Sequence, residues 1–184
     1  MEAKKWINEK NHVLKEKNLG PIIEDAFYQE RMMVLKLQDK EIFDYMVSKM
    51  NFCRRKELCS KLLDIDVKKG DLAYIDFGMA YQHEIGYLHF GLVVATNREK
   101  VFVVPLSGKY KAYLEAYDEK DNPQGKRHLM RLGFIPGLTK VSVLFLNDAK
   151  WINRSRIIEV KAHIDVQEKL FKNVQSRIIE MIRE

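Results

Sequence analysis

The sequence predicts an α+β fold in which a small, strongly curved antiparallel β-barrel follows an N-terminal helical segment and precedes a C-terminal helix. Residues 1–66 carry apolar side chains at steps of three and four, which is the period of a helix. Short apolar runs with turn residues between them follow, and residues 165–182 return to the helical period. Short strands in close succession before a single helix favour a curved barrel. We therefore expect a helical extension at residues 1–66 and a barrel domain at residues 67–184.

The N-terminal segment is expected to hold four helical pieces. The first carries Trp6, Val13 and Leu14 and stops before Pro21. A second helix begins at Pro21, since proline suits the first turn, where its missing N–H costs nothing. Asp39 is the expected N-cap of a third helix. A fourth, short piece is expected over residues 53–63.

The apolar runs of the second half predict six strands, over residues 72–77, 92–95, 101–106, 128–132, 142–146 and 157–160. Residues 96–100 have the length of a hairpin connection. Asn122-Pro123-Gln124-Gly125 is typical of a type I turn, with proline second and glycine fourth.

Residues 165–182 predict the C-terminal helix. Asp165 and Glu168 have the capping-box spacing. Apolar residues at steps of four then form one stripe, which packs on a core or against a partner subunit; they are Val166, Leu170, Val174, Ile178 and Ile182.

Composition excludes several classes of protein. The 184 residues include 32 Lys+Arg against 26 Asp+Glu, a net charge of +6 that permits nucleic acid as a partner without requiring it. No apolar run approaches the ~18 residues that a membrane span needs, and no apolar stretch follows the first charged residues. Two cysteines do not form a disulfide framework or a four-ligand zinc site. We expect a cytoplasmic protein with no membrane partner.

Five blocks in the barrel domain resemble, in order, those of the MazF/PemK-type toxins. The first is Lys69-Gly70-Asp71 with the strand behind it, which is similar to the opening strand of that family. The others lie at residues 84–97, 103–107, 137–147 and 148–156. The resemblance covers residues 67–184, and residues 1–66 have no counterpart in the compact members of the family.

The resemblance implies an SH3-like barrel of the MazF, PemK and CcdB kind, usually a homodimer. It implies an mRNA interferase, that is, a toxin–antitoxin endoribonuclease that cleaves single-stranded RNA without a metal ion or cofactor. The implied partners are single-stranded RNA and a cognate antitoxin, which is a protein or, in a variant of this hypothesis, an RNA.

Metal-free RNA cleavage needs a base for the 2′-OH, an acid for the leaving oxygen and a donor for the phosphorane. By position, the arginine at the start of the family's second strand becomes His89, and the hydroxyl at the end of its third strand becomes Ser107. His89 is a departure, because arginine is always cationic whereas histidine exchanges a proton near neutrality. Two hypotheses follow. Either His89 is the general acid or base and Lys150 or Lys109 supplies the fixed charge, or catalysis is lost and the barrel binds nucleic acid or a partner protein.

The loop between the first two strands is the expected substrate surface. Gln82, His83 and Glu84 are suited to reading the base edges that single-stranded RNA exposes. Tyr81 and Tyr87 either stack on bases or pack the loop against the barrel. The spacing of the two histidines and Glu84 matches no helical metal motif, so no metal site is expected.

A basic patch follows the type I turn. It comprises Lys126, Arg127, His128 and Arg131. Arg127 is the residue of this patch that we assign to substrate binding, because a cluster of cations suits the phosphate backbone. The alternative is a solvated flank of the turn.

Overall fold

In the computed structural model, residues 19–183 are described, and they divide into one unit that ends at Phe43 and another that runs from Asp44. The predicted domain boundary after residue 66 falls inside the second unit. The helix predicted around Trp6, Val13 and Leu14 lies outside the described residues. Within residues 19–183 we find no helix long and apolar enough to cross a membrane.

Two of the predicted N-terminal helices are confirmed. Helix α2 (Gly20–Val34) has Pro21 in its first turn, and α3 (Asp39–Arg55) begins at Asp39. Asp39 belongs to the first helical turn instead of capping it. The backbone N–H of Gln38 donates to Oε2 of Glu41 at 3.2 Å, which is half of a capping box set one residue earlier.

The piece predicted over residues 53–63 is not one helix. Helix α3 ends at Arg55, and a separate 3-10 turn, η1 (Ser60–Leu63), follows a break. Asp64 ends η1 in the left-handed conformation, with φ of 52°.

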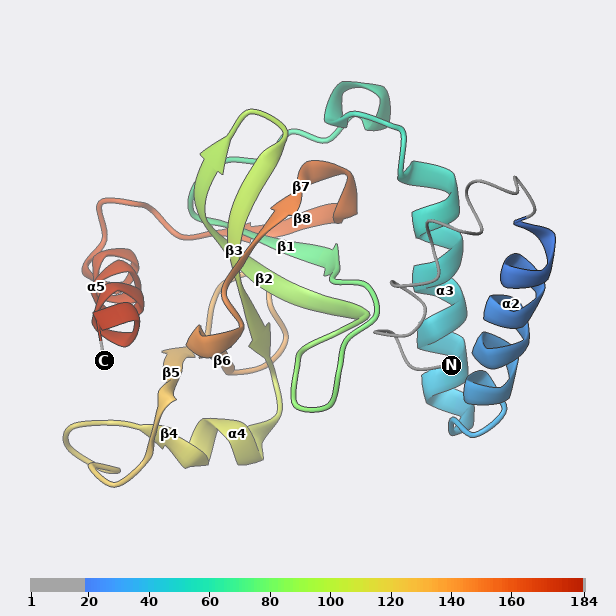
Figure 1. The fold of residues 1–184 in the computed structure, drawn as a ribbon. Helices are drawn as coiled ribbons and strands as arrows, with labels where there is room; N and C mark the ends of the chain where they lie inside the picture. Colours follow the sequence, from blue (N-terminus) through green and yellow to red (C-terminus); the bar gives the residue numbers. More distant parts are fainter. Residues whose placement is uncertain (1–18, 184) are drawn as a thin grey trace. The chain divides into compact units, whose positions relative to one another are not determined.

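One sheet of eight strands forms the body of the second unit (Figure 1). The strands are β1 (Asp71–Asp76), β2 (Leu88–Asn97), β3 (Lys100–Ser107), β4 (Ala116–Tyr117), β5 (Lys126–Gly133), β6 (Ser142–Phe145), β7 (Lys150–Asn153) and β8 (Ile157–His163). Their order is β4-β5-β6-β3-β2-β1-β8, and β7 pairs with β3. All pairs are antiparallel except β4 with β5. The α+β fold class is confirmed, with its strongly bent sheet, C-terminal helix and N-terminal helices.

Strand β3 bends the sheet because its two ends have different partners. Its first four residues pair with β7, whereas Leu106 and Ser107 pair with β6. The β2–β3 connection is tighter than predicted: Asn97 pairs with Lys100, and Arg98 takes a positive φ of 51°. The predicted turn is present, since the N–H of Gly125 donates to the carbonyl of Asn122 at 3.0 Å.

Helix α5 (Lys169–Arg183) lies against one face of the sheet. It begins at Lys169, after a turn in which Asp165 accepts from the N–H of Gln167 at 2.9 Å, so the predicted capping box does not start the helix. Phe171, Val174 and Ile178 are buried with residues of β1, β2, β3, β5 and β6. The apolar stripe from Val166 to Ile178 therefore packs on this protein's own core, whereas Ile182 is exposed.

A second core cluster fills the other face of the sheet, which we call the inner face. Its buried members are Val67, Ala73, Ile75, Phe77, Val93, Val101, Val103, Ile152 and Ile157. They come from the segments directly before and after β1 and from β1, β2, β3, β7 and β8. Alternation thus places neighbouring residues in different clusters: Leu92 of β2 and Val104 of β3 pack with α5, whereas Val93 and Val103 belong to the inner face.

Candidate active site

Strand register brings His89 and Ser107 together. Phe90 pairs with Leu106 across β2 and β3, so the register continued by one residue sets His89 opposite Ser107. Opposed residues of antiparallel strands share a face, with Cβ atoms about 4.5–5.5 Å apart. His89 also pairs with Ile75 of β1, which belongs to the inner-face cluster. Both predicted catalytic residues therefore lie at the end of the inner face, and both are half-buried.

The imidazole of His89 is oriented by the loop before it. Its Nδ1 lies 2.8 Å from the carbonyl oxygen of Gly86. A carbonyl only accepts, so Nδ1 carries the proton in this contact. Ser107 is fixed too, because its Oγ accepts from the N–H of Lys109 at 3.2 Å.

Lys150 brings a cation to the same face. It pairs with Val103 at the start of β7, and Val103 and Ser107 are an even number of residues apart on β3. Its Nζ lies 5.8 Å from the ring centroid of Phe77, which directly follows β1. Phe77 in turn lies next to Gly91 of β2, since a Cβ added to Gly91 would be 3.2 Å from Cζ of Phe77.

Asp148, in the 3-10 turn η2 (Leu146–Asp148), adds a carboxyl group that the sequence did not single out. Burial raises its pKa above the ordinary value, and the charge of Glu84 acts in the same direction. The charges of Lys150 and His128 and a hydrogen bond from the N–H of Ile85 oppose that shift. A half-buried carboxyl with a raised pKa is a stronger base than an ordinary aspartate.

Two consecutive loop residues link this carboxyl to the imidazole. The backbone N–H of Ile85 acts to lower the pKa of Asp148, and the carbonyl oxygen of Gly86 lies 2.8 Å from Nδ1 of His89. The loop is closed tightly at this point, because a Cβ on Gly86 would lie 2.5 Å from the Cβ of Ala80. Neighbouring backbone groups of residues 85 and 86 therefore face the carboxyl of Asp148 and the imidazole of His89.

The predicted substrate loop presents its tip to solvent. Gln82, His83 and Glu84 are exposed, and the N–H of Tyr81 donates to Oε2 of Glu84 at 3.2 Å. Tyr81 is 86% exposed.

The two loop tyrosines, which the sequence treated alike, differ in the structure. Tyr87 is half-buried and meets Tyr45 of α3 edge-on, with ring centroids 6.4 Å apart. Tyr87 thus packs the loop, whereas Tyr81 offers an open ring.

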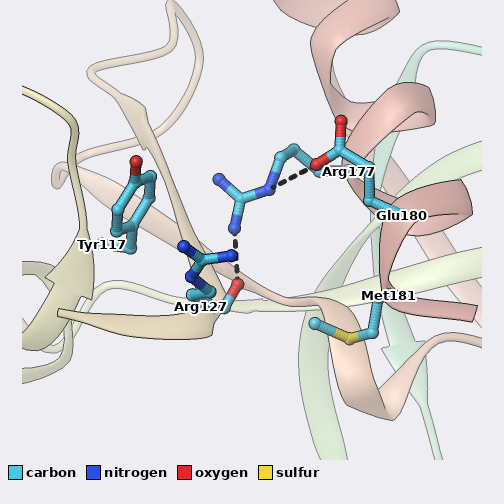
Figure 2. Close-up of a pocket in the computed structure, with 5 residues that line it drawn as sticks. All are labelled: Tyr117, Arg127, Arg177, Glu180 and Met181. Carbon is cyan, nitrogen blue, oxygen red and sulfur yellow. Dashed lines mark hydrogen bonds and ion pairs between the residues drawn. The ribbon is translucent and has the colours of Figure 1, made fainter. Parts of the chain in front are cut away.

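The predicted basic patch is divided. Lys126 pairs with Glu115 at 2.7 Å, and Arg131 pairs with Asp121 at 2.7 Å. Arg127 lines a separate pocket together with four residues that the sequence did not connect with it (Figure 2): Tyr117, Arg177, Glu180 and Met181. Lys109 is exposed at the start of the short helix α4 (Tyr110–Glu115).

Helix α3 anchors the point where the substrate loop leaves β1. The buried carboxylate of Asp76 accepts from Ser48 Oγ at 2.6 Å, from Asn51 Nδ2 at 3.2 Å and from the N–H of Gly78 at 3.0 Å. Arg55 of the same helix donates to the carbonyl of Ile157 at 3.0 Å. Nothing in the sequence signalled this network, since Ser48 and Asp76 are 28 residues apart.

The sequence did not point to two further residues near the candidate site, Asp148 and Lys140. Asp148 stands two positions before Lys150, and that spacing was its only signal in the sequence. Lys140 lies beside the turn after Ser107, because a Cβ on Gly108 would be 3.2 Å from the Cβ of Lys140. Among residues 19–183, no three His, Cys, Asp or Glu side chains group in a way that would hold a metal ion.

The raised pKa of Asp148 predicts a pH dependence of stability that needs no substrate. Between the ordinary value of 3.8 and the raised folded value, the folded state binds more protons, so stability falls as pH rises through this window. Asp148→Asn is expected to remove that fall, as measured by urea unfolding at a series of pH values. Asp118→Asn is the matched control with the opposite sign, because the N–H of Lys120 lowers the pKa of Asp118. An unchanged pH profile in Asp148→Asn would contradict the assignment.

No protein-family model and no curated protein matches the chain. Solved structures do. MazF from Deinococcus radiodurans matches with a TM-score of 0.49 and 15% identity, over 66% of this chain and 100% of that one. An endoribonuclease in complex with its cognate antitoxin, from a mycobacterial species, matches with a TM-score of 0.43 and 10% identity, over 64% and 96%. The chain is likewise similar to the Mycobacterium tuberculosis toxin MazF-mt6, with a TM-score of 0.41 and 9% identity over 60% of this chain and 93% of that one.

Proposed function

We propose that this protein is an endoribonuclease that cleaves single-stranded RNA without a metal ion, as the toxin of a toxin–antitoxin pair. The observation that carries the proposal is the placement of His89, Ser107 and Lys150 on one face of the barrel, with Asp148 close enough for the charge of Lys150 to act on its pKa. These four side chains supply a base, an acid, a hydroxyl donor and a fixed cation.

The proposed reaction uses each group once. The Asp148 carboxylate takes the proton of the 2′-OH, whose oxygen attacks the adjacent phosphorus. The bond from phosphorus to the 5′-oxygen breaks, and Nε2 of protonated His89 gives its proton to that oxygen. The products are a 2′,3′-cyclic phosphate and a 5′-OH. Lys150 and the hydroxyl of Ser107 stabilise the charge on the phosphorane.

The surrounding surface fits a substrate with unpaired bases. The side chains of Tyr81, Gln82 and His83 are exposed in the loop that precedes His89. An aromatic ring stacks on a base with about 1–3 kcal/mol, and amide and imidazole groups read base edges. We further propose a cytoplasmic homodimer restrained by a cognate antitoxin.

The test is incubation of the pure protein with defined single-stranded RNA in EDTA. We expect cleavage at a small set of sites, with 5′-OH ends and 2′,3′-cyclic phosphates. Primer extension maps the sites, and kinase labelling of the new ends without prior phosphatase treatment identifies the 5′-OH. Intact RNA, or cleavage that EDTA abolishes, would rule the proposal out.

A second candidate function is a binding module that does not cleave. It is favoured by the hydrogen bond from His89 to Gly86, which gives the histidine a purely structural role in closing the loop. Binding of a 2′-O-methyl oligonucleotide together with intact unmodified RNA is the result this candidate predicts.

A further inference from the structure

A pocket outside the candidate active site holds two arginines against one aromatic ring. Arg127 of β5 and Arg177 of α5 lie with their guanidinium carbons 5.5 Å and 5.3 Å from the ring centroid of Tyr117 in β4. Figure 2 shows the two guanidinium groups converging on the space between β5 and α5. Nη2 of Arg177 donates to the carbonyl oxygen of Arg127 at 2.6 Å, which fixes one arginine relative to the other.

The lining carries more positive than negative charge. Glu180 is its one acidic residue, 3.6 Å from Nε of Arg177, and its side chain is 63% exposed. An exposed ion pair of this kind contributes little to stability, so an incoming anion displaces Glu180 at small cost. Two guanidinium groups present planar forks of N–H donors, which match the oxygens of a phosphate group.

Strand β5 connects this pocket to the candidate active site. Arg127 lines the pocket, and the next residue, His128, is one of the charges that act on Asp148. Consecutive Cα atoms are about 3.8 Å apart. Arg127 and His128 therefore place a cation of the pocket and a charge that acts on Asp148 on adjacent residues of β5.

We propose that Arg127 and Arg177 bind a phosphodiester group of the RNA strand, one that flanks the cleaved bond, with Tyr117 holding the two guanidinium groups in place. The inference rests on the proposed function for the identity of the ligand. The shared chemistry is a phosphate group, which a free phosphate ion or a mononucleotide also carries.

The experiment measures binding by the full chain, using fluorescence anisotropy and 2′-O-methyl oligonucleotides, which lack the attacking hydroxyl. Arg127→Gln and Arg177→Gln are each expected to weaken binding of an oligonucleotide that spans both sites about tenfold, as expected for a lost charge-assisted hydrogen bond. The slope of log affinity against log salt should fall by about 0.7 for each lost phosphate contact on a single strand. A dinucleotide that fills only the active site should bind both variants as it binds the wild type.

Two controls accompany these variants. Lys172→Gln makes the same charge change on α5 at an exposed residue outside the pocket and should leave binding and salt slope unaltered. Tyr117→Phe keeps the ring and should bind normally, whereas Tyr117→Leu should weaken binding. Thermal unfolding confirms that each variant is folded.

The outcomes separate this inference from the proposed function. Wild-type affinity and salt slope in Arg127→Gln and Arg177→Gln would overturn it, even if the protein cleaves RNA. The inference would also be overturned if inorganic phosphate or a mononucleotide occupied the pocket without affecting oligonucleotide binding. The same holds if the two variants lost binding of an acidic peptide but kept binding of the oligonucleotide. If the protein does not cleave RNA but both variants lose oligonucleotide affinity, the phosphate-binding pocket is supported and the proposed endoribonuclease activity is refuted.

Discussion

Replacing His89 with glutamine is expected to lower the rate of RNA cleavage by a factor of about 10²–10⁴, the usual contribution of a positioned general acid. Glutamine retains an N–H that donates to the carbonyl of Gly86, the group that Nδ1 of His89 meets at 2.8 Å. The loop therefore keeps its contact, while the group that exchanges a proton near neutrality is lost. Single-turnover cleavage of a short oligonucleotide measures the rate, and 2′-O-methyl RNA shows whether binding is kept.

His89→Arg is the matched variant, because arginine is the residue that the MazF/PemK-type toxins carry at the position that resembles His89. A permanently charged guanidinium stabilises the phosphorane but does not titrate near neutrality. We expect His89→Arg to keep binding 2′-O-methyl RNA but to cleave as slowly as His89→Gln, because the guanidinium does not hand a proton to the leaving oxygen. A wild-type rate in His89→Gln would show that the histidine only shapes the loop.

The sequence predicted those elements whose signals are local. Apolar runs predicted β1, β3 and β6, since a strand that packs on both faces is apolar along its length. The strand β7 was missed because Trp151 and Asn153 are exposed and four residues are too few for a period to show. The helix α4 was missed for a related reason: it has six residues, no side-chain cap and no buried residue. Tertiary contacts stabilise both elements: β7 pairs with β3, and α4 contacts β5.

The residues of the candidate site also divide into those that the sequence pointed to and those that depend on contacts between distant segments. His89 and Ser107 were singled out because the resemblance to the MazF/PemK-type toxins assigns that family's arginine and hydroxyl to these positions, and the pairing of Phe90 with Leu106, continued by one residue, sets them opposite one another. Asp148 was not found, because its raised pKa arises from burial and from a loop some sixty residues earlier in the chain. Arg127 was found as a cation, but its partners on α5 depend on how the helix packs against the sheet.

Ser48→Ala is expected to destabilise the fold by about 1–3 kcal/mol and to lower the cleavage rate as well. The hydroxyl donates to the buried carboxylate of Asp76 at 2.6 Å, and a buried charge that loses a donor keeps most of its desolvation cost. The same oxygen of Asp76 accepts from the N–H of Gly78, where the substrate loop begins. Loosening Asp76 therefore loosens the loop that positions His89 and Asp148. Urea unfolding gives the stability, and single-turnover kinetics give the rate.

Ser176→Ala is the matched control, because it makes the same change at an exposed position of helix α5 and should leave both quantities near wild type. Asp76→Asn separates the charge from the contact: an amide oxygen in the place of Oδ1 still accepts from Ser48 and Gly78, but Nδ2 of Asn51 then faces an N–H₂ group. We therefore expect Asp76→Asn to lose stability and activity together, as Ser48→Ala does. If Ser48→Ala unfolds at the wild-type urea concentration and cleaves at the wild-type rate, α3 does not support the active-site loop, and the conformation of that loop is determined by the barrel alone.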